Sequence, residues 1–550
     1  MVHTIWKKLN GFRQDAHGIV LILTALLILP FIILLGVAVD VGHLLVVKNQ
    51  LIAAIDAAAL SAAKNPTLTD AQAQAQVQAF INANFSSQNQ ISVSNLTISR
   101  VNNNAQVDVT ATATVNTYFV EVIGYNTLST TIHSQALAAQ NYLEVVLVLD
   151  NTGSMGDTYG SSSGIDGLKT AATTLVNTLF ANDPTGTHIK IGIVPFTDTV
   201  NVGTQYANAA WIDNSNAAGS MSQENINVPT GTGLITFASN LASATGKPAW
   251  AWAGCVRQRT EPYDVQETAP STGTPATLFT PFFAPDEPDI DSSQASGGHT
   301  CGGGSNFYNS YLCDKSCWQA DQQADQKCIT KYTTSPQVQN TSNGPNNLCT
   351  IQPVIRLTDN QSALLNEINA MTAYGATVIP AGLMWGWHLI SPNGPFADGV
   401  AYSDNTRIKA IILVTDGFNN VQLQGNVVPT RTDNGFNKSI YNAYGYGSGP
   451  HLNLIAVPNG VNEDQPDYNL DQKLLSLCGN IKAVTDGSGN SGRILIYAIG
   501  FGTSINNHGL QLLGQCASSP SNFFYNPTGD DLNSTFRNIA LGLSKLRLSQ

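Results

Sequence analysis

The sequence predicts an α/β chain in two parts: an N-terminal transmembrane helix with a small α+β unit, and then a doubly wound parallel sheet with long insertions. Three observations carry this prediction. Residues 18–39 hold no charge, residues 107–115 alternate apolar with polar side chains, and beyond residue 140 apolar runs alternate with amphipathic stretches. Because strands that alternate with helices form a parallel sheet covered on both faces, we expect the larger part to be doubly wound.

The composition limits the class of protein. A chain of 550 residues is too long for one ordinary domain, so at least two folded units are expected. The 25 basic and 37 acidic residues give a net charge of −12, which argues against nucleic acid as a partner. Charged residues make up only 11% while Asn, Ser, Thr, Gly and Ala are abundant, which favours an extracytoplasmic protein with long polar loops.

The uncharged run at residues 18–39 predicts a membrane anchor. Its 22 residues would make a helix of about 33 Å, long enough to cross the hydrocarbon core. The basic residues of the 1–17 tail precede the run and Asp40 follows it, so the N-terminus is expected in the cytoplasm and the rest outside. The alternative is a cleaved signal peptide. Such peptides have an apolar core of about 7–15 residues, so the length favours an uncleaved anchor spanning residues 18–40.

Residues 41–139 predict a membrane-proximal α+β unit. The anchor helix continues through residues 41–64, and a second helix starts at Thr69, a good N-cap, and ends near Phe85. Alternating patterns then predict three strands, at residues 91–101, 107–115 and 128–136. A turn at residues 102–104 is expected to join the first strand to the second. A long helix packed on a small antiparallel sheet is the plan of pilin-like proteins. The alternative is a plain anchor followed by a stalk domain.

The stretch LEVVLVLDNTGSM, residues 143–155, predicts the main binding site. Its apolar run is typical of a central parallel strand, and it stops at a D-x-T-x-S loop formed by Asp150, Thr152 and Ser154. Open α/β sheets keep their ligand sites at the carboxyl ends of such strands. Carboxylate and hydroxyl oxygens suit Mg²⁺ first, with Ca²⁺ or Mn²⁺ next. We therefore expect a divalent cation at this loop.

The remaining pattern places a second domain at residues 140–546. Further strands are expected at residues 189–196, 407–416 and 493–500, and the second of them ends on Asp416. Amphipathic helices are expected at residues 165–180, 359–371, 378–390 and 530–546. Two polar insertions interrupt the domain, at about residues 201–356 and 419–468.

The cysteines and two polar segments lead to expectations about the insertions. Six cysteines lie in the first insertion, and Cys478 and Cys516 remain for each other. An exported chain with an even cysteine count favours disulfides over the alternative of zinc at Cys301, Cys313, Cys317, Cys328 and His299. The first insertion shows too little apolar periodicity for a large core, so disulfides are expected to hold it together. Its acidic turn at residues 285–291 is more typical of a solvated loop than of a Ca²⁺ site. The tyrosines of YNAYGYGSGP are expected to be exposed beside the metal as a recognition surface.

Four segments together resemble a known family. FRQDAHGIVLILTALLILPFIILLGVAVDVGHLLVVKNQLIAAIDAAALSAA, followed by DNTGSM, GATVIPAGLMWGW and VTDG, is similar to TadG-type proteins of the tight-adherence (Flp) pilus-assembly system. These proteins join a TadE/TadG-like membrane segment to a von Willebrand factor A (VWA) domain, which has a Rossmann-like sheet. One departure is that related pseudopilins have a Glu soon after the glycine, whereas apolar residues such as Leu23 follow Gly18 here.

The resemblance implies a metal-ion-dependent adhesion site. The family uses D-x-S-x-S, a Thr and an Asp in this chain order, and the matching residues are Asp150, Thr152, Ser154, Thr377 and Asp416. Thr152 replaces the first Ser and keeps its hydroxyl. Few direct carboxylate ligands would leave the cation to seek an acidic side chain of a partner protein.

The function implied is binding and not catalysis. We expect a single-pass protein of a bacterial inner membrane, with its bulk in the periplasm, that binds other pilus-assembly components during assembly or surface adhesion. One alternative is an adhesin released from the membrane. Another is a serine hydrolase that uses Ser162 in the G-x-S-x-G pattern at residues 160–164. In hydrolases this pattern joins a strand directly to a helix, whereas the predicted strand ends ten residues earlier.

Overall fold

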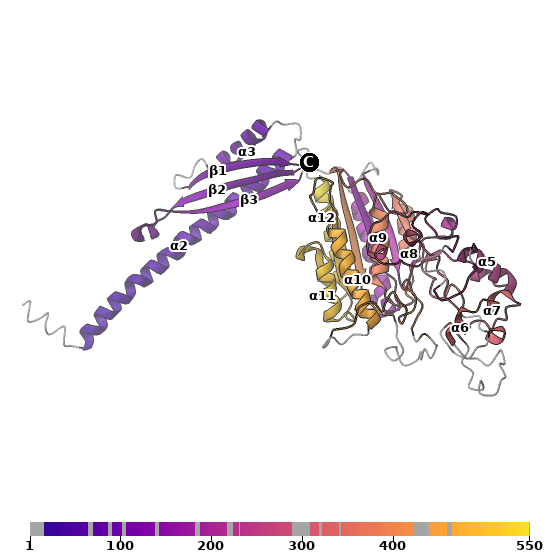
Figure 1. Cartoon of the computed structure of the whole chain (residues 1–550). Helices are drawn as coiled ribbons and strands as arrows, with labels where there is room; N and C mark the ends of the chain where they lie inside the picture. Colours follow the sequence, from indigo (N-terminus) through magenta and orange to yellow (C-terminus); the bar gives the residue numbers. More distant parts are fainter. Residues whose placement is uncertain are drawn as a thin grey trace, which may run out of the picture. The chain divides into compact units, whose positions relative to one another are not determined.

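The chain forms two compact units, residues 1–140 with 546–550 and residues 141–545, and each is described by itself. Figure 1 shows both in a computed structural model. The structure describes residues 16–63, 70–85, 91–101, 106–137, 142–181, 188–216, 224–229, 231–288, 309–317, 322–339, 343–421, 437, 439–458 and 465–548.

The first unit packs two helices against a three-stranded antiparallel sheet (Figure 1). Helix α2 (Ala16–Ala63) contains the predicted anchor and its expected continuation, and α3 (Asp70–Phe85) follows. The sheet has the order β1-β2-β3, with bounds Ile91–Val101, Gln106–Asn116 and Thr127–Leu137. Alternate residues of β2 from Val107 to Val115 are buried, as the pattern predicts. The turn expected at residues 102–104 lies outside the described residues.

Helix α2 has two apolar regions with different surroundings. Leu51, Ile55 and Ala58 are fully buried within the core of the first unit, whereas large apolar side chains between Leu26 and Val46 are exposed. Among the residues whose side chains are described, Leu34–Ala62 is long and apolar enough to cross a membrane. The exposed region is the one that matches the predicted anchor, because the buried region is already covered by protein.

The second unit is built on a six-stranded sheet with the order β10-β7-β4-β11-β12-β13. Five strands are parallel and the edge strand β10 is antiparallel. The chain starts in the middle with β4, moves outward to β7 and β10, and then crosses to β11, β12 and β13. The winding direction therefore reverses between β4 and β11. The bounds are β4 Tyr142–Asp150, β7 Ile189–Phe196, β10 Ile355–Thr358, β11 Arg407–Thr415, β12 Ile494–Phe501 and β13 Phe523–Asn526.

Helices cover both faces of this sheet. Helix α9 (Ile379–Ile390) is buried along its whole length and contacts β4, β7 and β11. It lies close to the sheet because Gly382 and Gly386 leave room: a Cβ at either position would come within 2.5 Å of a side chain of the sheet. Helices α10 (Gln465–Lys482) and α11 (Asn507–Cys516) contribute to the same apolar cluster. Helices α4 (Gly164–Ala181) and α8 (Gln361–Ala370) contact each other and β7, but their residues are not part of that cluster. Because successive strand residues face opposite sides of a sheet, these two helices cover the other face.

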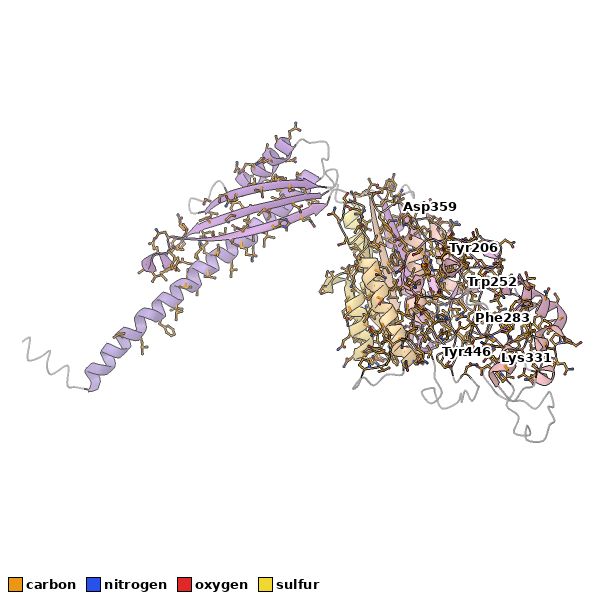
Figure 2. All side chains as sticks on the ribbon, in the orientation of Figure 1. Tyr206, Trp252, Phe283, Lys331, Asp359 and Tyr446 are labelled. Carbon is orange, nitrogen blue, oxygen red and sulfur yellow. A yellow bond between two sulfur atoms is a disulfide. The ribbon has the colours of Figure 1, made fainter. Side chains whose placement is uncertain are left out.

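The first insertion holds more structure than its sequence predicts. It contains α5 (Leu234–Thr245), and an apolar cluster of its own surrounds Phe237, Trp250, Phe283 and Tyr332. Figure 2 shows Phe283 and Lys331 among its packed side chains. Nothing in the sequence indicated this cluster, because its apolar residues come from distant segments and so leave no periodic signal, and it adds to the disulfides that were expected to hold the insertion together. The remaining helices and short strands are β5 Thr158–Tyr159, β6 Ser162–Ser163, β8 Val200–Asn201, β9 Cys255–Val256, α6 Gln322–Lys327, α7 Thr330–Thr333 and α12 Gly529–Leu548.

Disulfides cross-link the second unit. The structure pairs Cys255 with Cys349, Cys317 with Cys328, and Cys478 with Cys516. Cys313 is also disulfide-bonded. The zinc alternative is therefore wrong for Cys313, Cys317 and Cys328, while Cys301 and His299 lie outside the described residues.

Candidate metal site

The two acidic residues of the predicted site lie at the point where the sheet reverses its winding. Asp150 is the last residue of β4 and Asp416 follows β11, and these strands are paired in parallel, with Leu149 opposite Val414. Parallel neighbours end at the same edge, so both carboxylates lie there. Open α/β sheets bind ligands in the crevice at such a reversal.

A chain of hydrogen bonds joins four of the predicted residues. One carboxylate oxygen of Asp150 accepts from the Thr152 N–H at 2.8 Å. The Thr152 and Ser154 hydroxyl oxygens lie 3.1 Å apart, and Ser154 donates to Asp416 Oδ1 at 2.7 Å. The structure thus places two carboxylates and two hydroxyls of the D-x-T-x-S loop and of the strand end in one cluster.

Thr377 comes to the same edge on a separate loop. The Gly153 N–H donates to the Gly375 carbonyl at 2.9 Å, which ties the D-x-T-x-S loop to this second loop. A Cβ added to Gly417 would lie 3.6 Å from Thr377 Oγ1, so this hydroxyl lies beside the residue that follows Asp416. All five predicted positions are therefore neighbours, although they come from three distant segments.

Three polar residues that the sequence analysis missed support the two carboxylates. The Thr415 hydroxyl donates to Asp150 Oδ2 at 2.6 Å. The Tyr159 hydroxyl donates to Asp416 Oδ2 at 3.0 Å and lies 3.0 Å from the Ser504 hydroxyl, which can donate to it. Thr415 could have been predicted from the sequence, because it directly precedes Asp416 at the end of a predicted strand.

Asp198 holds the loop that carries Thr377. Its buried carboxylate accepts from the Ala376 N–H at 2.8 Å. Gly375 has a φ of +86°, and a Cβ there would come within 2.2 Å of Asp198 Oδ2, so only glycine fits. Burial raises the pKa of Asp198 to about 7. Asp198 could have been predicted from the sequence, because it is an acid that lies just after the strand predicted at residues 189–196.

The electrostatics of the cluster favour an added positive charge. Burial raises the pKa of the Asp150 carboxyl. Burial, and then the neighbouring charge of Asp150, raise the pKa of Asp416 to about 7. The protein partners of these two carboxylates are hydroxyls and backbone N–H groups, which carry no full charge. A divalent cation would offset the mutual repulsion of the two acids.

The donor set fits a hard cation. Two carboxylates and three hydroxyls offer only oxygen, and Mg²⁺ prefers oxygen ligands together with several waters. No group of three or more His, Cys, Asp or Glu side chains that could hold a metal occurs in the described part of the chain. A cation here would therefore depend on the hydroxyls. Gly153 is exposed and Ser154 is half-buried, so the cluster is reachable from solvent.

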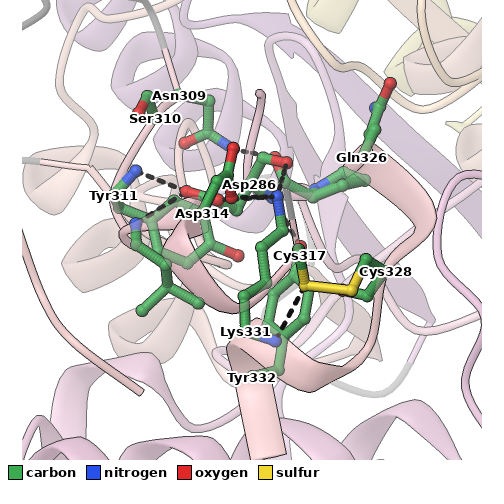
Figure 3. Close-up of polar contacts among 12 residues, drawn as sticks. Asp286, Asn309, Ser310, Tyr311, Asp314, Cys317, Gln326, Cys328, Lys331 and Tyr332 are labelled. Atoms are coloured by element: carbon green, nitrogen blue, oxygen red, sulfur yellow. Dashed lines mark hydrogen bonds and ion pairs between the residues drawn. A yellow bond between two sulfur atoms is a disulfide. The ribbon is translucent and has the colours of Figure 1, made fainter. Parts of the chain in front are cut away.

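The described part of the acidic turn, residues 285–288, is neither a solvated loop nor a cation site. Asp286 is fully buried, and its carboxylate accepts from the Tyr311 and Leu312 N–H groups at 2.6 and 2.7 Å. The Lys331 ammonium lies 2.9 Å from Asp286 and 2.8 Å from Asp314 (Figure 3). Lys331 already supplies the positive charge that a bound Ca²⁺ would bring, so both interpretations are wrong here.

The tyrosines of the second insertion do not form a recognition surface. Tyr441, Tyr444 and Tyr446 are all buried. The Tyr441 ring packs 5.3 Å from Phe282, and the Arg257 guanidinium lies 5.2 Å from its centre. The expectation of exposure is wrong, because segment polarity does not show which side chains turn inward.

Ser162 does not lie in a nucleophile elbow. It belongs to β6, a two-residue strand of a hairpin separate from the six-stranded sheet. In the hydrolase elbow the serine follows a strand of the main sheet. This geometry gives no support to the hydrolase alternative.

Comparison with known proteins gives a family match for the N-terminal segment. The family described as "Putative Flp pilus-assembly TadE/G-like" matches residues 18–65, which lie mostly in α2. Among curated proteins, none matches the sequence.

Solved structures give distant likenesses to pilus proteins. The chain is similar to the pilus adhesin SpaC from Lactobacillus rhamnosus GG, at 12% identity and a TM-score of 0.30, over 84% of this chain and 36% of that one. It is similar to the vWF domain of a type V pili tip protein from Porphyromonas gingivalis, at 12% identity and a TM-score of 0.31, over 73% and 95%. It is also similar to the PilB minor pilin from Streptococcus sanguinis, at 12% identity and a TM-score of 0.30, over 83% and 78%. This chain thus spans about a third of the SpaC chain, and these scores carry no functional conclusion. The family likeness is therefore limited to the N-terminal segment, which is similar to TadE/G-like proteins of Flp pilus assembly.

Proposed function

We propose that this chain is a membrane-anchored, extracytoplasmic protein that binds partner proteins through a divalent cation, during Flp pilus assembly or surface adhesion. The observation that carries the proposal is the cluster of Asp150, Thr152, Ser154 and Asp416 at the reversal of the sheet, with Thr377 beside it. The TadE/G-like match at residues 18–65 supports the pilus context and the anchor.

The chemistry of the cluster supports a binding role. A bound Mg²⁺ would supply a Lewis-acidic position for an oxygen ligand from outside the chain. Ser154, Thr152 and Thr377 would offer hydroxyl oxygens, while Asp150 and Asp416 would neutralise the cation directly or through water. An Asp or Glu side chain of a partner is the ligand that best completes such a shell. Ca²⁺ and Mn²⁺ are the other candidate ions.

The wider assignment rests on the resemblance to TadG-type proteins. The order of the site residues along the chain, which resembles that of the VWA family, supports the proposal of a VWA domain with an adhesion-type metal site. In this proposal residues 1–17 are cytoplasmic, residues 18–40 of α2 cross the inner membrane, and the rest of the chain lies in the periplasm. The alternative of a released adhesin would be favoured by finding a mature chain without residues 1–40 in the culture medium.

A cation titration tests the proposed site. Mg²⁺, Ca²⁺ and Mn²⁺ are titrated into the purified protein by calorimetry, with thermal melts alongside, for wild type and Asp150→Ala. Asp359→Ala is the matched control, because Asp359 is an exposed acid of the same unit (Figure 2). At a cation concentration of about 1,000 times Kd the folded state should gain about 4 kcal/mol.

The three proteins should respond differently. Wild type and Asp359→Ala are expected to bind one ion and to melt at a higher temperature with it, whereas Asp150→Ala should show neither effect. If wild type shows no binding of any of the three ions, the metal-dependent function is wrong. The second unit would then serve as a scaffold.

A further inference from the structure

The turn between β2 and β3 carries an unusual group of exposed apolar side chains. It includes the short 3-10 helix η1 (Val120–Ile123) and lies at one end of the three-stranded sheet (Figure 1). Folded domains generally turn polar residues outward at such turns. The exposed fractions are 50% for Tyr118, 48% for Phe119, 79% for Val122, 46% for Ile123 and 63% for Tyr125.

This turn is fixed to α2 by a buried carboxylate. Asp40 is 1% exposed and accepts from the N–H groups of Tyr118, Phe119 and Val120 at 2.9, 2.9 and 2.8 Å. The three bonds orient the backbone so that the apolar side chains are held in place and cannot simply fold inward. Their exposure is therefore a property of a well-defined conformation.

The turn lies at a defined level of α2. A Cβ at Gly36 would come within 2.5 Å of Phe119, and the His43 ring lies 5.8 Å from that of Tyr118. At about 1.5 Å per residue, this contact zone covers roughly 10 Å of helix. It includes the outer end of the uncharged run at residues 18–39 and Asp40, the first charged residue after that run.

The exposed side chains of the turn lie at the same level of α2 as exposed side chains of the anchor. Large apolar side chains of α2 remain exposed from Leu26 to Val46, on both sides of the level where the turn is attached. Tyr and Trp are enriched at the membrane–water boundary, because their rings are apolar and their polar ends reach water. The exposed Glu121 within the turn would be costly in hydrocarbon, which places the turn among the headgroups.

We propose that residues 118–125 form a second membrane contact, a turn that rests in the outer interfacial layer of the bilayer crossed by α2. Tyr118 and Tyr125 lie at headgroup level, and Val122 and Ile123 face the acyl chains. Together with Asp40 this contact sets the depth of the anchor and holds the three-stranded sheet against the membrane surface. The inference rests on the anchoring part of the proposed function and is independent of the metal site.

Lipid quenching tests the contact in the full chain reconstituted in nanodiscs. Single cysteines replace Val122, Leu35 and Gln135 and carry a fluorophore, and the lipids carry nitroxide groups near the headgroup. Labelling is specific, because no native cysteine precedes Cys255 and none in the described residues is free. Leu35, 60% exposed on α2, reports the anchor. Gln135, exposed on β3, lies about 30 Å along the strand from the turn and is the control.

Quenching is expected to be strong for V122C and L35C and several times weaker for Q135C. Quenching of L35C with none for V122C would overturn the proposal and leave anchoring intact. Cross-linking between V122C copies would then show that a second copy of the chain covers the turn in place of lipid. Absence of quenching at both positions would overturn anchoring itself, and the proposed contact with it.

Discussion

Two pairs of buried acids in the second unit differ in what balances their charge. Asp286 and Asp314 share Lys331, whose side chain is fully buried between them (Figure 3). Asp150 and Asp416 are linked instead by hydroxyls and a backbone N–H. A buried charge needs a partner of opposite sign or it destabilises the fold. The first pair has an internal cation, and the second has a set of oxygen ligands that an external cation fits.

The difference is also visible in the pKa values. Although burial opposes it, the charges of Asp286 and Asp314 raise the pKa of Lys331, so the lysine stays protonated. At the other pair, burial and mutual repulsion raise the pKa of Asp416 to about 7. Burial also raises the pKa of Asp286, but the charge of Lys331 opposes that rise, whereas the groups that oppose the rise at Asp416 are the uncharged hydroxyls of Ser154 and Tyr159.

The largest expected effect comes from removing the internal cation. Lys331→Met leaves Asp286 and Asp314 buried without a counter-ion, and we expect it to lower the free energy of unfolding by about 3–5 kcal/mol. Urea denaturation followed by tryptophan fluorescence measures this loss. Lys327→Met, a nearby lysine that is not fully buried, is the matched control and should change stability by less than about 1 kcal/mol. Equal losses for both variants would mean that the pair contributes nothing specific.

The second pair should respond with the opposite sign. Asp416→Asn removes one of two repelling carboxylates, so in the presence of a chelator we expect it to stabilise the protein by about 1–3 kcal/mol at about pH 8. The pKa of Asp416 in the folded protein, about 7, is higher than its ordinary value of 3.8. The stability that protonated Asp416 contributes is therefore fully present below pH 3.8 and is lost as the pH rises through about 7.

Denaturation of chelated protein at several pH values measures this effect. Wild type should lose more stability than Asp416→Asn between about pH 4 and about pH 8, and the two should be nearly equal at the acidic end. Asp198 also has a pKa raised to about 7 by burial, but it is present in both proteins and cancels in the comparison. A destabilised Asp416→Asn at high pH would show that the carboxylate is already balanced, and the contrast between the two pairs would fail.

Sequence reasoning anticipated one pair and not the other, for a physical reason. Asp150 and Asp416 each follow an apolar strand, and parallel strands in a doubly wound sheet bring their carboxyl ends together. Lys331 and Asp286 lie 45 residues apart in a segment without periodicity, so nothing local indicates that they meet. The same limit explains why β10 and β13, only four residues each, were missed.

The supporting residues of the site show how far the sequence could go. Ser504 lies 345 residues from Tyr159 and Asp416 lies 257 residues from it, and only the folded sheet brings them together. Loop composition could not reveal that Tyr159 turns inward, just as it could not reveal burial of Tyr444. Positions that depend on a strand end were predictable, whereas positions that depend on a loop conformation were not.

The smallest expected change in stability comes from removing one of the hydroxyls that donate to Asp416. Tyr159→Phe removes the donor to Asp416 Oδ2 and keeps the ring, whose centre lies 5.4 Å from that of Phe501. We expect a loss of about 1 kcal/mol in chelated protein, because one buried hydrogen bond is removed. Urea denaturation measures it, with Tyr525→Phe as the control, since that tyrosine is 45% exposed.

The cation titration of Tyr159→Phe then separates two roles of this hydroxyl. If it positions Asp416 for the ion, the affinity for Mg²⁺ should fall by about tenfold, as is usual for a group that orients a ligand. An affinity that rises instead would mean that the hydroxyl competes with the ion for Asp416. Affinity and stability both unchanged would show that Tyr159 does not support the carboxylate, and Ser154 would then be the one hydroxyl donor to Asp416 among the described residues.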